Sequence, residues 1–332
     1  MDLTNEWRMN KPSVKVSVIV PVLNEERYIS SLMESLLLQS YPRNEMEWIF
    51  VDGGSGDNTV SVIERFKSEC PIRVLKTQRG TPHQLNVGIR ESTGKYVIRL
   101  DAHTYYPDNY IEKCVLYLDN CDADNVGGRV NTVGTGLIGQ AIAKVLSSKF
   151  GVGGSQFRVG GESGYVDTVP FGAFRREVFD RIGLFNEELI RSEDNDINAR
   201  IRQAGGKVYL AEDIESDYHC RDTVSAIIKY AMQNGNALFH TIKVNPKAMS
   251  IRHFIPFLFV VSLILLPILG IKFTFLRYMF FMEIVLYLLM DIYFSFFSKG
   301  RQYGFVTVLL FPLFHISYGI GSAISFIGIK LY

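Results

Sequence analysis

The sequence has little cysteine and no large excess of charge, and both scarcities narrow its class. Four cysteines occur among 332 residues, and none forms a Cys-x-x-Cys pair. This spacing suits neither a zinc site nor a disulfide framework, and it favours a reducing compartment. The formal net charge is +1, and residues 254–332 hold five basic and two acidic side chains, which leaves 30 basic and 32 acidic side chains, or a charge of −2, in residues 1–253. A chain without a basic excess is not expected to bind nucleic acid as its main partner.

Two common phosphate-binding motifs are also missing. No Gly-x-Gly-x-x-Gly follows the first predicted strand, and no Gly-x-x-x-x-Gly-Lys-Ser/Thr occurs. A dinucleotide fingerprint and a P-loop are therefore excluded. Residues 1–13 contain no apolar run, so we expect no signal peptide and a cytosolic N-terminal part.

The last 80 residues differ in composition from the rest. Residues 254–271 contain no charged side chain, and in residues 302–329 only His315 titrates near neutral pH. Residues 273–297 are apolar but carry three charges. About 20 apolar residues span a bilayer as a helix, so the pattern predicts two strong transmembrane helices and a weaker third. The alternative is a buried helical hairpin in a water-soluble domain.

Basic residues flank the predicted spans on the side expected to be cytosolic. Three of them lie between residues 243 and 252, and Lys299 and Arg301 follow the second span. By the positive-inside rule, this pattern predicts a multi-pass protein of the plasma membrane with residues 1–253 in the cytosol. Three crossings would place Tyr332 outside.

Four regions follow from these boundaries. We expect an N-terminal tail at residues 1–13, an α/β catalytic domain at 14–221, an amphipathic connector helix at 222–252 and a membrane domain at 253–332. The connector has an apolar stripe at helical spacing, so it either packs into a core or lies at the membrane interface.

Apolar strands alternate with helices in residues 14–211. The strands are expected at residues 14–22, 47–54, 72–77 and 95–102. Strands that are apolar on both faces and separated by helices predict a largely parallel sheet covered on both sides. Ligands of such sheets bind at the carboxyl ends of the strands.

Acidic and amide side chains follow three of these strands. Asn24 and Glu25 follow the first, Asp52 ends the second, and Asp101 and His103 follow the fourth. Such groups can bind a nucleotide, although Asp-Gly-Gly is also an ordinary turn. Asp101 and His103 could bridge a divalent ion to a diphosphate; alternatively, Asp101 caps a turn and His103 is a surface histidine.

A further acidic cluster begins at Ser192. Ser192 is an expected N-cap that places Glu193 and Asp194 in the first turn of a helix. These acids either complement the helix dipole or present a carboxylate to the crevice as a base. Residues 134–164 contain nine glycines and are expected to form a mobile, substrate-ordered loop.

Several of these segments together resemble the family-2 glycosyltransferases. The resemblance covers about residues 14–240 and rests on the order of the segments VSVIVPVLNEERYI, WIFVDGGSGDNT, QLNVGIRESTGKYVIRLDAHT and FGAFRREVFDRIGLFNEELIRSEDNDINARIRQAGG. The segment FGVGGSQFRVGGESGYVDTVPFGAFRRE is similar to the succinoglycan-type exopolysaccharide branch of that family.

The resemblance implies a GT-A fold with a Rossmann-like, mostly parallel sheet, followed by C-terminal transmembrane helices near 254–271, 273–297 and 302–329. It implies a nucleotide-diphosphate sugar donor, with a UDP-sugar favoured, a divalent cation, Mn²⁺ or Mg²⁺, and inversion at the anomeric carbon. Carried over residue by residue, it assigns donor binding to Pro21, Asn24, Glu25, Asp52, Asn86 and Asp101, metal binding to Asp101 and His103, the catalytic base to Asp194, and the acceptor side to Glu193 and Gln233.

Two departures from the family pattern refine the expectation. His103 stands where the family has a second metal-site acid, which bears on the choice of metal. The Gln-x-x-Arg-Trp of processive synthases is missing, and residues 233–236 are the nearest stretch. We therefore expect a membrane-anchored, inverting, non-processive hexosyltransferase that acts on a polyprenyl-linked saccharide in cell-surface polysaccharide synthesis. The alternatives are a non-catalytic nucleotide-sugar-binding membrane protein and a small transporter or scaffold.

Overall fold

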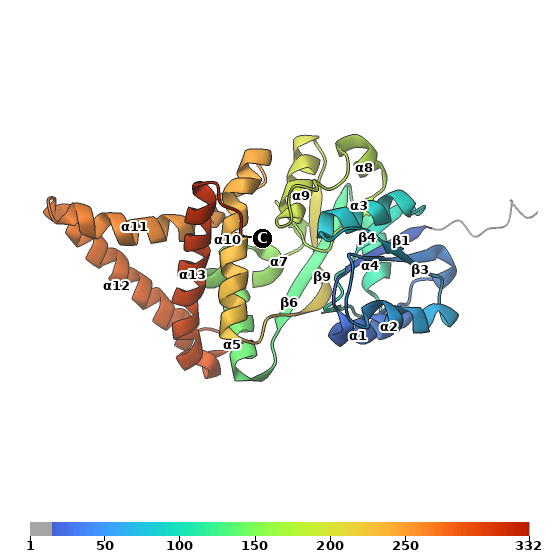
Figure 1. The fold of residues 1–332 in the computed structure, drawn as a ribbon, viewed down its shortest axis with the longest axis horizontal. Coiled ribbons are helices and arrows are strands. Elements are labelled where there is room, and N and C mark those ends of the chain that lie inside the picture. Colours follow the sequence, from blue (N-terminus) through green and yellow to red (C-terminus); the bar gives the residue numbers. More distant parts are fainter. Residues whose placement is uncertain (1–14, 332) are drawn as a thin grey trace, which may run out of the picture. The chain divides into compact units, whose positions relative to one another are not determined.

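The computed structural model describes residues 15–331, so the expected tail at residues 1–13 lies outside the described residues. The described chain forms two compact units (Figure 1). The first unit contains residues up to 128, 163–188 and 200–216, and the second contains residues 129–162, 189–199 and 217 onward. Two internal segments of the expected α/β domain thus group with the C-terminal helices.

The first unit holds most of the α/β elements. They are β1 (Val16–Val22), α1 (Glu26–Leu37), β2 (Met46–Asp52), α2 (Thr59–Arg65), β3 (Ile72–Lys76), α3 (Thr81–Glu91), β4 (Tyr96–Arg99), β5 (Thr104–Tyr105), α4 (Tyr110–Asn120), β7 (Gly164–Tyr165), β8 (Ala173–Arg175) and α8 (Glu177–Ile182). Three further elements have residues in both units: β6 (Asn125–Val133), α9 (Glu193–Gln203) and β9 (Val208–His219).

The strands form one mixed sheet. Its order is β3-β2-β1-β4-β8-β6-β9-β5, and β7 pairs with β9. The four strands expected from the sequence run parallel, whereas β8 is antiparallel to both β4 and β6. Val22 lies opposite Asp52 in the register of β1 and β2, so the ends of these strands meet at one edge. The predicted parallel sheet is therefore confirmed for its first half, whereas β8 with its two neighbours and β7 with β9 pair antiparallel.

Helices cover both faces of the parallel half. Val18 and Val20 of β1 belong to a buried cluster with Leu32 and Leu36 of α1. On the other face, α3 packs directly over Ile19. The central strands β1, β2 and β4 are mainly apolar on both sides because both sides are covered, whereas the edge strand β3 exposes Arg73 and Lys76.

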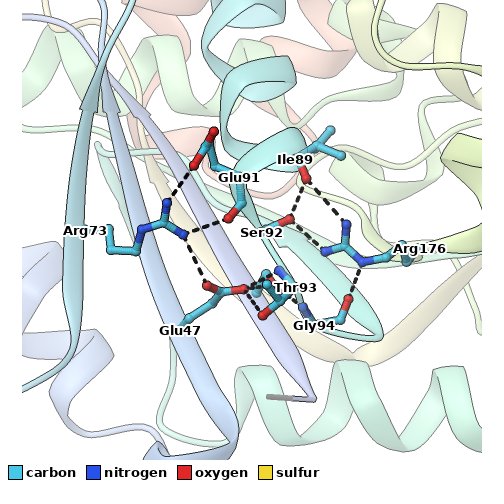
Figure 2. A network of polar contacts seen from close by, with 9 residues as sticks. Glu47, Arg73, Ile89, Glu91, Ser92, Thr93, Gly94 and Arg176 are labelled. Carbon is cyan, nitrogen blue, oxygen red and sulfur yellow. Dashed lines mark hydrogen bonds and ion pairs between the residues drawn. The ribbon is translucent and has the colours of Figure 1, made fainter. Parts of the chain in front are cut away.

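A polar network closes the amino-end edge of the sheet (Figure 2). Glu47 of β2 accepts hydrogen bonds from the Thr93 backbone N–H at 2.6 Å and from the Ser17 hydroxyl at 2.7 Å. The Arg176 guanidinium donates to the Gly94 carbonyl at 2.5 Å and to the Ser92 hydroxyl at 2.7 Å. The turn between α3 and β4 is thereby fixed at the edge opposite the strand ends that carry the acids.

The second unit is mainly helical. Its elements include α5 (Gly136–Leu146), α6 (Lys149–Val152), α7 (Gln156–Val159), α10 (Val224–Val244), α11 (Ile255–Gly270), α12 (Thr274–Phe296) and α13 (Gly304–Phe326). The expected connector helix corresponds to α10, whose N-cap Thr223 accepts from the Ala226 N–H at 3.3 Å.

The glycine-rich residues 134–164 do not form the expected irregular loop, because they contain α5, α6 and α7. Lys144 of α5 donates to the Ser295 carbonyl at the end of α12, at 2.6 Å. Phe150 of α6 stacks on Phe294 with ring centroids 5.5 Å apart. Packing against the C-terminal helices thus orders a segment whose composition alone indicates mobility.

Two helices of the described chain are long and apolar enough to cross a membrane: α12, and the 301–326 segment that contains α13. The first expected span forms only the 16-residue α11, about 24 Å long at 1.5 Å per residue and shorter than a hydrocarbon core of about 30 Å. The order of strength expected from the sequence is therefore wrong, since the segment considered weakest forms a 23-residue helix.

Candidate active site

The loops after β1 and β2 are tied together at the carboxyl edge of the sheet. The Asp52 carboxylate accepts from the Ser55 N–H at 2.9 Å, and the Asn24 amide oxygen accepts from the Gly56 N–H at 2.8 Å. The Asn24 N–H in turn donates to the Ser55 hydroxyl at 2.9 Å. Asn24 adopts a positive φ of 56°, which asparagine tolerates better than most residues. Asn24 and Asp52, both predicted to bind the sugar donor, thus help to hold the loops after β1 and β2 in place.

Gln84 was not predicted as part of this edge, and it braces both strands. Its buried amide donates to the Val22 carbonyl at 2.8 Å and to the Val51 carbonyl at 2.7 Å. A Cβ at Gly53 would lie 3.1 Å from the same amide, so the glycine leaves room for it. No sequence signal marks Gln84, because its partners are backbone carbonyls of distant strands.

Glu25, Asp101 and His103 lie together beside this turn. His103 Nδ1 is 3.3 Å from a Glu25 carboxylate oxygen, and its Nε2 is 3.9 Å from an Asp101 carboxylate oxygen. The side chains of the three residues are only about one-fifth exposed. The Asp101 N–H donates to the Tyr106 hydroxyl at 2.8 Å, and Arg99 lies 3.6 Å from the Asp101 carboxylate. A charged ligand that binds here would replace the contacts of His103 with Glu25 and Asp101.

The donor set of the cluster is compatible with a divalent cation. Within residues 15–331, no group of three or more His, Cys, Asp or Glu side chains has the geometry to hold a metal ion by itself. Asp101 and His103 nevertheless present one oxygen and one nitrogen to the same space. Mn²⁺ accepts both kinds of donor, and the oxygens of a diphosphate could complete its coordination.

Pro21 and Asn86, which were also predicted to bind the sugar donor, are buried and lie outside the cluster of Glu25, Asp101 and His103. Pro21 is buried within β1, where it pairs in register with Val51. Asn86 is 1% exposed, and its amide donates to the Phe185 carbonyl at 2.9 Å and to the Glu187 carboxylate at 2.8 Å. Asn86 therefore fixes residues 185–187, a contact that no local sequence pattern indicates.

The remaining predicted residues belong to the second unit. The helix α9 begins at Glu193, as the Ser192 cap predicts, and Ser192 itself has a positive φ of 67°. The Asp196 N–H donates to the Ser192 carbonyl at 3.0 Å. Glu193 and Asp194 thus occupy the first turn, where the helix dipole favours an ionised carboxylate.

Three side-chain hydrogen bonds tie this turn to α10 and to Asn245, the residue that follows α10. Arg191 donates to the Gln233 amide oxygen at 2.5 Å and to that of Asn234 at 3.3 Å. The buried Asn245 amide donates to the Asp196 carboxylate at 2.9 Å. Gln233, predicted on the acceptor side, is therefore linked to the segment that carries Asp194. Arg191 and Asn245 were not among the predicted residues.

The two sets of predicted residues, one in each unit, differ in their chemistry. The strand-end turn offers acids, amides and backbone N–H groups, which suit the hydroxyls and the phosphates of a nucleotide. The α9 turn offers carboxylates at a helix N-terminus, which suit a general base.

Comparisons with known proteins agree with these features. Residues 17–183 match the family model for glycosyl transferase family 2. The succinoglycan biosynthesis protein ExoA of Rhizobium meliloti is 31% identical over 61% of this chain and 63% of its own length. A dolichyl N-acetyl-glucosaminyl phosphate diacetamido-glucuronosyltransferase of Methanococcus voltae is 28% identical over 67% of this chain and 72% of its own length.

Solved structures show the same fold at low identity. The mannosyltransferase PcManGT from Pyrobaculum calidifontis, solved with GDP-Man and Mn²⁺, has a TM-score of 0.58 at 18% identity and covers 98% of this chain and 92% of its own. Residues 1–349 of Staphylococcus aureus TarS, solved with UDP-GlcNAc, have a TM-score of 0.51 at 17% identity and cover 96% of this chain and 93% of theirs. The fold is the expected GT-A type, and the chain belongs to glycosyl transferase family 2.

Proposed function

We propose that this protein is a membrane-associated, inverting glycosyltransferase that adds one sugar from a nucleotide-diphosphate sugar to a lipid-linked saccharide. The observation that carries the proposal is the convergence of Asn24, Glu25, Asp52, Asp101 and His103 at the carboxyl edge of β1, β2 and β4. Acids and amides gathered at this edge of a parallel sheet suit a nucleotide.

Asp52, Asn24 and Glu25 are proposed to bind the base and the ribose, with Pro21 ending the strand beneath them. Carboxylate and amide groups can accept hydrogen bonds from ribose hydroxyls and from a base N–H. A UDP-sugar is the favoured donor, and TarS, a protein of the same fold, was solved with UDP-GlcNAc. Asn86 is proposed to act indirectly, by holding residues 185–187.

Asp101 and His103 are proposed to hold Mn²⁺ or Mg²⁺ together with the donor diphosphate. A bound cation would neutralise charge on the departing diphosphate. Glu25 lies against His103 and is proposed to fix the orientation of the imidazole. The Asp101 backbone is held by Tyr106, so the carboxylate has a defined direction.

Asp194 is proposed as the general base. In direct displacement, the acceptor oxygen bonds to the anomeric carbon as the bond to the diphosphate breaks, and the acceptor proton passes to a carboxylate. A carboxylate held at the start of a helix remains ionised and can take that proton late in the step. Inversion follows because the acceptor attacks from the face opposite the leaving group.

The acceptor is proposed to be a polyprenyl-linked saccharide. The named activities of the ExoA and dolichyl-phosphate relatives concern exopolysaccharide synthesis and a lipid-linked sugar. Glu193 and Gln233 lie in or beside the α9 turn and are proposed to face the acceptor. Because no Gln-x-x-Arg-Trp motif is present, one sugar is added and the product leaves.

Release of the nucleoside diphosphate tests the proposal. Membranes containing the protein are incubated with single nucleotide sugars, with and without an extract of lipid-linked saccharides. We expect fast release from one donor only when acceptor lipid is present, and loss of this release in Asp194→Asn. Donor binding without release under any condition would support the non-catalytic alternative instead.

A further inference from the structure

The last helix of the chain packs along α10 with almost no side chain between the two backbones. A Cβ at Gly235 of α10 would lie 1.9 Å from the Tyr318 carbonyl, and one at Gly321 of α13 would lie 2.1 Å from the Met232 carbonyl. Beyond α13, the Leu331 N–H donates to the Asn236 amide oxygen at 2.9 Å. The Ser322 hydroxyl donates to the Gly235 carbonyl at 3.1 Å, and four residues further along each helix the rings of Phe239 and Phe326 lie 5.2 Å apart, so the two helices run in the same direction.

This part of α10 is also hydrogen-bonded to residues 191–196, the segment around the start of α9 that contains the proposed base Asp194. Gln233 and Asn234 accept from Arg191, and Asn245, just after α10, donates to the buried Asp196. The C-terminal half of α13 and the start of α9 therefore contact neighbouring parts of the same helix, α10.

The N-terminal half of α13 contacts a second segment of the catalytic region. His315 Nε2 lies 3.0 Å from the Phe150 carbonyl of α6, and the Phe150 ring lies 5.0 Å from that of Phe311. Both halves of α13 are thus lined by segments that precede residue 253. If α13 crossed a bilayer, it would carry the acids and amides of α9 and α10 into the hydrocarbon, where polar groups are strongly disfavoured.

The C-terminal half of α12 also contacts α5 and α6, through Ser295 and Tyr287, but the part of the α11–α12 hairpin near its turn is exposed (Figure 1). Near its turn, Ile271 is 87% exposed, Phe275 71% and Tyr278 66%. The two helices are linked to each other by the Ser262 hydroxyl, which donates to the Glu283 carboxylate at 2.6 Å. Two charges, Lys272 and Arg277, stand at the turn, and such residues are common where a helix leaves the hydrocarbon.

One apolar stripe of α13 remains exposed beside this hairpin. Its residues recur at a spacing of three or four along one face of the helix: Phe305, Leu309, Leu313, Ile316 and Ile320. A helix with one apolar face outward and the other face packed on protein suits the surface of a bilayer.

We infer that the α11–α12 hairpin crosses the lipid bilayer, which thins locally around the 16-residue α11, while α13 lies along the bilayer surface beside α10 and leaves residue 330 on the catalytic side. The inference extends the proposed function by naming how the enzyme meets the membrane that holds its lipid-linked acceptor. It differs from the three crossings expected from the sequence, which would leave the chain end on the far side.

Cysteine accessibility in cells expressing the full-length protein tests the inference. The background is Cys121→Ser, because Cys121 is only partly buried while the other three cysteines are buried. One cysteine at a time is introduced, by Lys330→Cys or by Lys272→Cys. The substitution Ser61→Cys, at an exposed position of the α/β domain, is the reference for the catalytic side. Labelling by a membrane-impermeant maleimide is compared before and after permeabilisation.

We expect Lys330→Cys to behave like Ser61→Cys and to be labelled only after permeabilisation, whereas Lys272→Cys is labelled in intact cells. Labelling of Lys330→Cys in intact cells would overturn the inference, because α13 would then cross. Protection of Lys272→Cys in intact cells, or release of the chain by an alkaline wash, would overturn it too, since the hairpin would then not span lipid. Sugar transfer is measured on the same variants, so that a topology failure is distinguished from a failure of the proposed function.

Discussion

A single carboxylate carries the proposed proton transfer. We predict that Asp194→Asn lowers turnover by about 10²–10⁴ while donor binding survives, because the amide keeps the shape of the side chain and loses its basicity. Turnover and donor affinity are measured separately on the purified enzyme. Glu193→Gln is the matched control and should be milder, since adjacent helix positions point about 100° apart. Near-parental turnover of Asp194→Asn would move the base to another residue.

The choice of the proposed cation is expected to depend on the His103 imidazole. An imidazole ligand suits Mn²⁺ better than Mg²⁺, so we predict a higher initial rate with Mn²⁺ and a smaller difference in His103→Asp. His83→Gln, a histidine paired with Glu187, serves as the control and should keep the parental ratio. Equal rates with the two ions in the parent enzyme would contradict this assignment.

The sequence indicates some of these residues and not others. Asn24, Asp52, Asp101 and His103 could be predicted as strand-end residues because each lies at the end of an apolar strand or a few residues after it. Gln84 could not, because its amide braces backbone carbonyls of two other strands. Contacts of this kind depend on the register of the sheet and leave no local pattern.

At the scale of the elements, the position of the α9 turn depends on hydrogen bonds to α10 and to Asn245, the residue after α10. We predict that Asn245→Ala lowers turnover about tenfold with little change in donor affinity, because the buried Asp196 carboxylate loses a donor and the α9 turn loosens. Steady-state kinetics and donor binding measure the two effects. Asn120→Ala removes an exposed hydrogen bond from the Asn120 side chain to the Leu116 carbonyl at the end of α4, and it should leave turnover and donor affinity unchanged. A parental rate in Asn245→Ala would show that this link does not position the base.

The turn between α3 and β4 is predicted to matter for stability alone. Burial lowers the pKa of Arg176, whose guanidinium satisfies the Gly94 carbonyl and the Ser92 hydroxyl. Arg176→Met should reduce the free energy of unfolding by about 1–3 kcal/mol, because these groups then lack a donor. Thermal unfolding measures the loss. Arg90→Met, in an exposed pair with Glu187, should change it by less than about 0.5 kcal/mol. A change in donor affinity of Arg176→Met would contradict a purely structural role.

The elements of the parallel half-sheet could be read from periodicity, because each strand is apolar and each helix has one apolar face. The helices α5, α6 and α7 could not. Their glycine content indicates a mobile segment, and their order comes from contacts such as that of Lys144 with the end of α12, more than a hundred residues away.

For the whole molecule, composition marks the C-terminal region as apolar, but it misjudges the helices within that region and does not reveal that residues 129–162 and 189–199 group with them. Runs without charge do not reveal where a helix begins and ends, or which face is covered by protein. α11 is shorter than its apolar run, and half of the 301–326 segment that contains α13 is buried. The number of crossings therefore depends on packing that hydropathy does not report.

The central claim is single-sugar transfer from a nucleotide sugar to a membrane lipid. Its most direct test incubates membranes containing the protein, or its Asp194→Asn variant, with a panel of labelled nucleotide sugars, and then weighs the labelled lipid by mass spectrometry. The account predicts one donor that labels the lipid fraction, a mass increase of one sugar, and little label with the variant. Label in water-soluble polymer, a ladder of added sugars, or equal labelling by the variant would contradict it.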